Sequence, residues 1–171
     1  MCLVWLLIHV ATIGREVVSM FRSLYEKIVV QISAEDIEAD DRDAAIRLAT
    51  AVLMVDVALV DSRFDEAEFD QMLGLIKNHF GLGTQEAAEL INAANAKADE
   101  LVSIHEFTEL LHKHLTHDEK ARIVSLLWQI AYADGELDKY EDSLVLKISD
   151  LLYVSRGKVM QLKHDAEQAA G

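Results

Sequence analysis

Four copies of one short spacing punctuate this chain, and each places a helix-capping residue three positions before a glutamate. The pairs are Asp65 with Glu68, Ser103 with Glu106, Thr116 with Glu119, and Asp138 with Glu141. In this arrangement the side chain of the first residue accepts a backbone N–H of the first helical turn, and the glutamate accepts the N–H of the cap residue. The chain also has no proline that would interrupt a helix. Each pair therefore predicts the start of a helix.

Apolar residues recur at helical spacing between these signals, and no segment alternates strictly as a strand would. Gly81 and Gly83 predict a helix end, whereas Thr84 and Ser155 are expected to cap the helices that follow them. The predicted helices cover residues near 20–32, 42–60, 66–80, 85–98, 104–115, 117–133, 139–152 and 156–168. The sequence thus predicts an all-α fold, a compact bundle of about seven to eight helices.

An internal repeat suggests how this bundle is organised. The segment from Ala58 to Glu68 matches the segment from Ala131 to Glu141 at a constant offset of 73 residues. Each copy follows an apolar helix and precedes an amphipathic one, so each is expected to form an acidic helix-to-helix turn. Two such helix pairs predict two related halves around a pseudo-twofold axis.

The charge balance limits the classes of partner. The chain has 30 acidic against 16 Lys and Arg residues, a formal charge of −14, which repels a phosphate backbone and argues against nucleic acid. Its one cysteine, Cys2, excludes an intrachain disulfide or a zinc–thiolate cluster and suits a reducing cytoplasm. No phosphate-binding glycine loop or nucleophile elbow is present, so no small-molecule substrate is indicated.

The second acidic turn carries a resemblance to a known family. Its sequence, Ala133-Asp-Gly-Glu-Leu-Asp-Lys-Tyr-Glu141, is similar to the "ADGxIDxxE" signature of the tellurite-resistance TerB family. A related domain occurs at the N-terminus of a DnaJ-like membrane co-chaperone. The copy at residues 60–68 is degenerate, with Ser62 in place of the glycine, and the similarity covers about residues 40–168. The resemblance implies an all-helical fold, acidic residues that bind divalent metal, and a role in stress or tellurite resistance.

The residues themselves give a physical reason to consider a cation. Asp61 and Asp134 each follow a predicted helix, where free carbonyls and the helix dipole disfavour a carboxylate unless a positive charge compensates. Oxygen ligands suit Ca²⁺ or Mg²⁺ better than Zn²⁺. The stronger candidate metal site consists of Asp134, Asp138 and Glu141, and the weaker one of Asp61, Asp65 and Glu68.

Neither turn is a complete calcium loop. The second turn reproduces the later half of an EF-hand, but Ile130 and Tyr132 stand where the first two aspartates would be. One turn alone should therefore bind metal weakly, and tight binding would require the two turns to converge.

A metal-free alternative uses the same residues. Asp65 with Glu68 and Asp138 with Glu141 are complete capping boxes, whose only task can be to start helices. Gly135 most simply supplies a positive φ at the helix end. Under this interpretation the chain is a helical protein–protein interaction scaffold. Under the metal-site interpretation it is a cation-binding module with an unidentified partner protein or membrane-associated complex. Neither interpretation makes the chain an enzyme, and a hydrolase with paired carboxylates is the least supported alternative.

The first residues stand apart from this plan. Residues 2–13 are almost all apolar, but they are too few to span a bilayer and no positive charges precede them. Three interpretations stay open: a helix packed on the domain, an interfacial membrane anchor, or an upstream extension with Met20 as the native start, which is the one we favour. The expected organisation is thus an apolar extension at 1–19 and a single helical domain at 20–171.

Overall fold

Seven α-helices make up most of the part of the chain that the computed structural model describes, which is residues 39–60, 66–98 and 104–170. They are α2 (Ala39–Leu59), α3 (Glu66–Phe80), α4 (Thr84–Ala98), α5 (Ile104–His114), α6 (His117–Ala131), α7 (Lys139–Leu151) and α8 (Arg156–Ala170). No strand occurs in these ranges. The all-α prediction is confirmed, whereas the extension at 1–19 lies outside the described residues.

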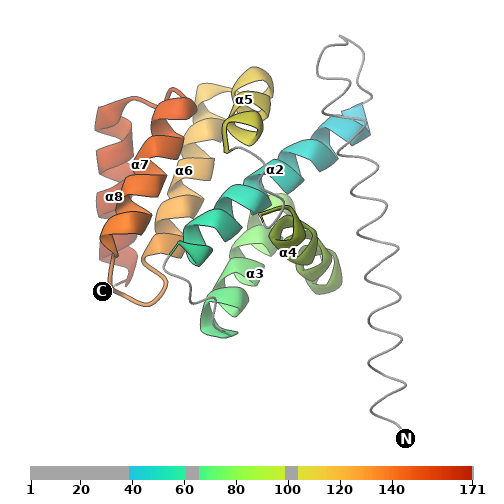
Figure 1. Cartoon of the computed structure of the whole chain (residues 1–171), viewed down its shortest axis with the longest axis horizontal. Coiled ribbons are helices and arrows are strands. Elements are labelled where there is room, and N and C mark those ends of the chain that lie inside the picture. The colour runs from blue at the N-terminus through green and yellow to red at the C-terminus, as the bar shows by residue number, and fades with distance from the viewer. Residues whose placement is uncertain (1–38, 61–65, 99–103, 171) are drawn as a thin grey trace, which may run out of the picture.

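Helix α2 is the centre of the bundle. Its residues from Ala51 to Ala58 are buried apolar side chains, apart from the half-buried Asp56. It packs against α3 and α4 on one side and against α5, α6 and α7 on the other (Figure 1). A helix surrounded in this way needs apolar residues on nearly every face, which explains why its sequence has little amphipathic character.

Helix α6 forms the second layer of the core. Trp128 and Leu127 are fully buried on it, and it packs against α2, α7 and α8. Burying one such side chain contributes about 1.5–3 kcal/mol to folding before the entropy cost is counted. The two helices that precede the repeated acidic segments, α2 and α6, therefore lie against each other in the core. The pseudo-twofold symmetry of the two halves stays a prediction.

The local signals for helix starts correspond to real contacts. Thr116 begins α6 with a complete capping box, in which its N–H donates to Glu119 Oε2 at 2.8 Å and its hydroxyl accepts the N–H of Glu119 at 3.4 Å. Ser155 Oγ accepts the N–H of Lys158 at 3.4 Å ahead of α8. The predicted caps Asp65 and Ser103 lie outside the described residues.

One cap prediction is wrong by one residue. Thr84 is already the first residue of α4, and the N–H of Gly83 donates to Glu86 Oε2 at 2.8 Å. The Thr84 hydroxyl instead accepts from Lys77 Nζ at 2.6 Å. Glycine is also an acceptable N-cap, so the position before a threonine can begin the helix. In the described ranges, no helix has the length and apolar content needed to cross a membrane.

Candidate functional site at the turn between α6 and α7

The acidic turn after α6 is built on a backbone reversal that glycine permits. Tyr132 is the C-cap of α6, and the N–H of Gly135 donates to the carbonyl of Tyr132 at 3.0 Å. Gly135 has a φ of +86°, in the left-handed region that disfavours a side chain. A Cβ on Gly135 would meet no atom within 4 Å, so the requirement comes from the backbone alone. The positive φ predicted for Gly135 is confirmed.

Asp134 lies exposed within this turn, directly after the carboxyl end of α6. Its Oδ1 accepts the N–H of Glu136 at 3.0 Å, which closes a local turn between side chain and backbone. The amide of Glu136 thus supplies part of the positive charge that this carboxylate needs at the negative end of a helix.

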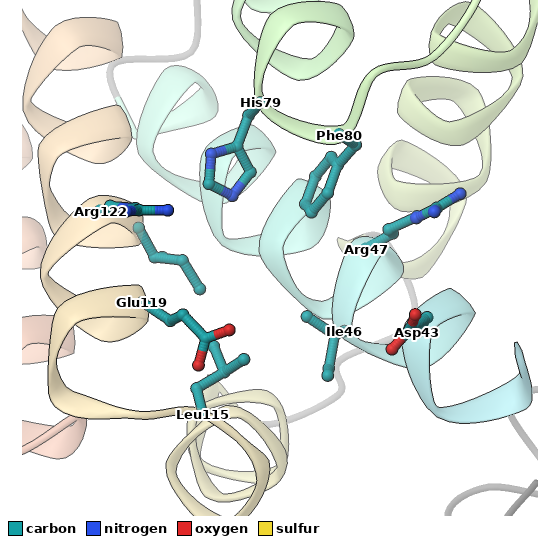
Figure 2. A pocket seen from close by; sticks show the side chains of 9 residues that line it. Asp43, Ile46, Arg47, His79, Phe80, Leu115, Glu119 and Arg122 are labelled. Atoms are coloured by element: carbon teal, nitrogen blue, oxygen red, sulfur yellow. The ribbon is translucent and has the colours of Figure 1, made fainter. Parts of the chain in front are cut away.

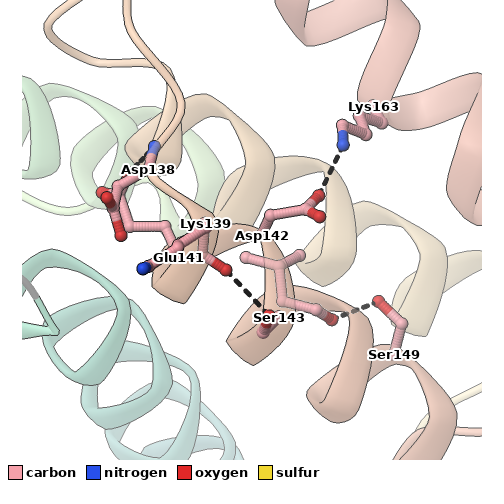
Figure 3. A network of polar contacts seen from close by, with 8 residues as sticks. Asp138, Lys139, Glu141, Asp142, Ser143, Ser149 and Lys163 are labelled. Carbon is pink, nitrogen blue, oxygen red and sulfur yellow. Dashed lines mark hydrogen bonds and ion pairs between the residues drawn. The ribbon is translucent and has the colours of Figure 1, made fainter.

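Asp138 and Glu141 form the capping box of α7 (Figure 3). Asp138 Oδ1 accepts the N–H of Tyr140 at 2.7 Å, and Glu141 Oε2 accepts the N–H of Asp138 at 3.0 Å. Glu141 is 7% exposed, so its carboxylate needs these donors to offset its desolvation. Both carboxylates also lie at the positive end of the α7 dipole. The helix start accounts for both residues without a cation.

The described residues contain no group of three or more His, Cys, Asp or Glu side chains placed to hold a metal ion. Asp138 and Glu141 are brought together, but Asp134 does not complete a three-carboxylate site with them. Asp61 and Asp65 lie outside the described residues, as does the side chain of Glu68, whose backbone is in α3. A site shared between the two turns therefore stays a prediction.

A groove borders the same turn on the side of α8. It has a volume of about 650 Å³ and is lined by Tyr132, Gly135, Leu137, Met160, Lys163, His164, Glu167 and Ala170. Lys163 fixes one wall, because its Nζ contacts Asp142 Oδ1 of α7 at 2.5 Å (Figure 3). The same Nζ lies 5.1 Å from the centroid of the Trp128 ring. This pair ties α7 to α8. Sequence reasoning missed the groove, because the α8 residues come from a separate segment with no distinctive spacing.

A second polar contact was also missed. Lys120 is only 4% exposed, and its Nζ lies 3.0 Å from His112 Nδ1. Because an ammonium can only donate, the imidazole nitrogen is the acceptor in this contact. The ring of Tyr153 packs on His112 with centroids 4.4 Å apart. The contact joins α5 and α6 to the loop after α7.

The fold and this turn define a class: all-helical domains in which an Asp-Gly-Glu-Leu-Asp turn joins a buried helix to a capped one. The sequence matches the family model described as "Tellurite resistance protein TerB" over residues 47–164. That match covers more than half of the chain, so the protein belongs to the TerB family, and the resemblance of the acidic turn is confirmed. No curated protein and no solved structure matches the chain.

Proposed function

We propose that this TerB-family protein is a non-catalytic binding module in tellurite resistance. In this proposal, a partner protein binds in the groove between the α6–α7 turn and α8, and the turn needs no metal ion. One observation carries the proposal: the turn with the family signature forms a wall of the 650 Å³ groove. Ligand pockets in proteins range from about 300 to 1,000 Å³, so the groove has room for one or two side chains of a partner.

The lining of the groove suits a peptide segment. Tyr132, Leu137 and Met160 supply apolar surface, and Met160 is 45% exposed, which is unusual for a large apolar side chain in the described part. Methionine adapts its shape to different partners, so it is common on protein-binding surfaces. Lys163 and Glu167 add charges at the edge. The partner segment expected here has an apolar side chain flanked by charged residues.

The contacts of the carboxylates support a turn that works without metal. Asp138, Glu141 and Asp134 each have an oxygen that accepts a backbone N–H within the turn. Donors of the turn thereby already balance their charge in part, and a cation would have to compete with them.

A second candidate function is divalent-cation binding, and one observation favours it. Asp134 is exposed at the carboxyl end of α6, where the helix dipole attracts a cation. Calorimetric titration with Ca²⁺, Mg²⁺ and Mn²⁺ decides between the two. Under the groove proposal, wild type and Asp134→Asn both give no binding heat, whereas a cation site gives saturable heat that Asp134→Asn reduces.

The groove proposal is tested in cells that lack their own TerB-family protein and are grown on tellurite. Wild type is expected to restore growth, and Met160→Glu is expected to lose it, because a carboxylate then faces the apolar wall. Gln161→Glu is the matched control: it adds the same group to an exposed neighbour on α8 that does not line the groove. Both variants should melt at the wild-type temperature. Normal growth with Met160→Glu, or no rescue by wild type, would refute the proposal.

A further inference from the structure

Three arginines gather at the end of α6 that is remote from the acidic turn. Arg42 and Arg47 come from α2, and Arg122 comes from the first turns of α6. The chain has seven arginines. Two of them, Arg47 and Arg122, line one pocket, and Arg42 lies close enough to its lining residue Glu119 to lower the pKa of that carboxylate. This end of the bundle is separate from the groove described above, and an inference drawn from it does not depend on that groove.

The pocket between these arginines has a volume of about 300 Å³. Arg122 of α6 and Arg47 of α2 lie on either side of it, and His79 and Phe80 reach it from the end of α3 (Figure 2). Ile46 and Ile123 line it with apolar surface. The pocket therefore combines two guanidinium groups with an apolar lining that includes one aromatic ring.

The two carboxylates of the lining already have partners. Glu119 Oε2 accepts the N–H of Thr116 at 2.8 Å and its hydroxyl at 2.7 Å, as part of the α6 capping box. Asp43 Oδ1 lies 3.9 Å from Arg42 Nε. The hydrogen bonds from Thr116 lower the pKa of Glu119, and the charges of Arg122 and Arg42 lower it further, so this carboxylate keeps its charge. It is held in place by Thr116 rather than by an arginine of the pocket.

Arg47 and Arg122, by contrast, form no ion pair with any residue in the described ranges. Burial lowers the pKa of His79, and the charge of Arg122 lowers it further. The imidazole is thus neutral near pH 7 and presents a hydrogen-bonding group without adding a charge. Two guanidinium groups that no described carboxylate holds in an ion pair are an arrangement that an anionic ligand would complete.

We propose that this pocket binds a small organic anion, with its carboxylate or phosphate group on Arg122 and Arg47 and its apolar portion against Phe80 and Ile46. Guanidinium groups bind planar carboxylates and phosphates through paired, charge-assisted hydrogen bonds. The apolar lining selects an anion with a hydrocarbon or aromatic part over a free inorganic ion.

The experiment is an NMR titration of the ¹⁵N-labelled chain with two probes, phenyl phosphate and benzoate, which separate the two kinds of oxyanion. At least one probe is expected to give saturable shifts at the amides of Phe80 and Arg122. Phenol, which lacks the anionic group, is expected to bind at least about tenfold more weakly, because charge-assisted hydrogen bonds contribute the larger part of the affinity.

Arg122→Gln and Arg47→Gln are each expected to weaken the probe at least about tenfold. Arg156→Gln, on α8 and outside the pocket lining, is the matched control and should bind as wild type does. Both test positions lie outside the buried core, and an unchanged melting temperature confirms that each variant folds. The proposal is overturned if neither probe saturates, if phenol binds as tightly as the anions, or if both glutamine variants keep wild-type affinity.

Discussion

The capping box of α7 leads to a prediction that separates helix capping from metal binding at one residue. Replacing Asp138 with alanine removes the oxygen that accepts the N–H of Tyr140 at 2.7 Å, and loss of an N-cap side chain costs about 1 kcal/mol, within a range of about 0.5–2. For a chain of this size, that loss lowers the melting temperature by about 2–4 °C. Asparagine caps helices nearly as well as aspartate, so Asp138→Asn should lower it by about 1 °C or less.

A bound cation would give a different pattern. A metal at one hundred times its dissociation constant stabilises the folded state by about 2.7 kcal/mol, which exceeds the cap contribution. A site that includes Asp138 would then lose this stabilisation in the asparagine and alanine variants alike, because an amide is a poorer ligand for Ca²⁺ than a carboxylate.

The assay is thermal unfolding followed by circular dichroism at pH 7, with excess Ca²⁺ or with a chelator. Capping predicts that Asp138→Ala melts below Asp138→Asn and that the chelator shifts none of the three proteins. The reasoning is refuted if both variants fall equally, or if the chelator lowers the melting temperature of wild type but not that of the variants.

Three further predictions follow from single residues. Gly135→Ala places a Cβ at a φ of +86° and should lower the free energy of unfolding by about 1–2 kcal/mol, which lowers the melting temperature by several degrees. An unchanged melting temperature would contradict the backbone argument. Burial raises the pKa of Asp56 from 3.8 to about 6, so the folded protein keeps a proton that the unfolded chain releases, and stability falls as pH rises through about 4–6. Asp56→Asn should therefore raise the melting temperature more at pH 7.5 than at pH 4.5, and equal gains at the two pH values would contradict this. Lys120→Met should leave the free energy of unfolding, measured in urea, unchanged or raise it, because a buried ammonium is replaced by an apolar side chain of similar length. A loss above about 1 kcal/mol would show that the contact with His112 stabilises the fold by more than the desolvation of the ammonium costs.

The helix plan could be predicted from sequence because the signals that start helices are local. Helices α3, α6 and α7 begin at Glu66, His117 and Lys139, directly after the residues predicted to cap them. Helix termini without such a signal were predicted less accurately: α2 begins at residue 39 rather than 42, and α8 continues to residue 170 rather than 168. A cap fixes a helix start through hydrogen bonds between residues three apart, whereas a terminus without a cap is set by packing.

The two concave surfaces could not be predicted, because they depend on how helices pack. Arg47 and Arg122 are 75 positions apart and become neighbours of one pocket only after α2 lies against α6. The contact of Asp142 with Lys163 likewise requires α7 and α8 to lie together. No periodicity within either helix marks these residues, since an exposed arginine or lysine is the default on a helix surface.

The acidic turn shows why one motif supports two functional interpretations. A hard cation and a helix N-terminus make the same demand, which is oxygen acceptors held close together, and aspartate and glutamate meet both. At the start of α7 the backbone N–H groups already supply the positive partner, so Asp138 and Glu141 carry no information about metal. Asp134 differs because it follows a helix end, where the N–H of Glu136 is the one donor that its carboxylate meets among the described residues. At this turn, evidence for a cation must therefore come from Asp134, and its substitution by asparagine leaves the capping box of α7 intact.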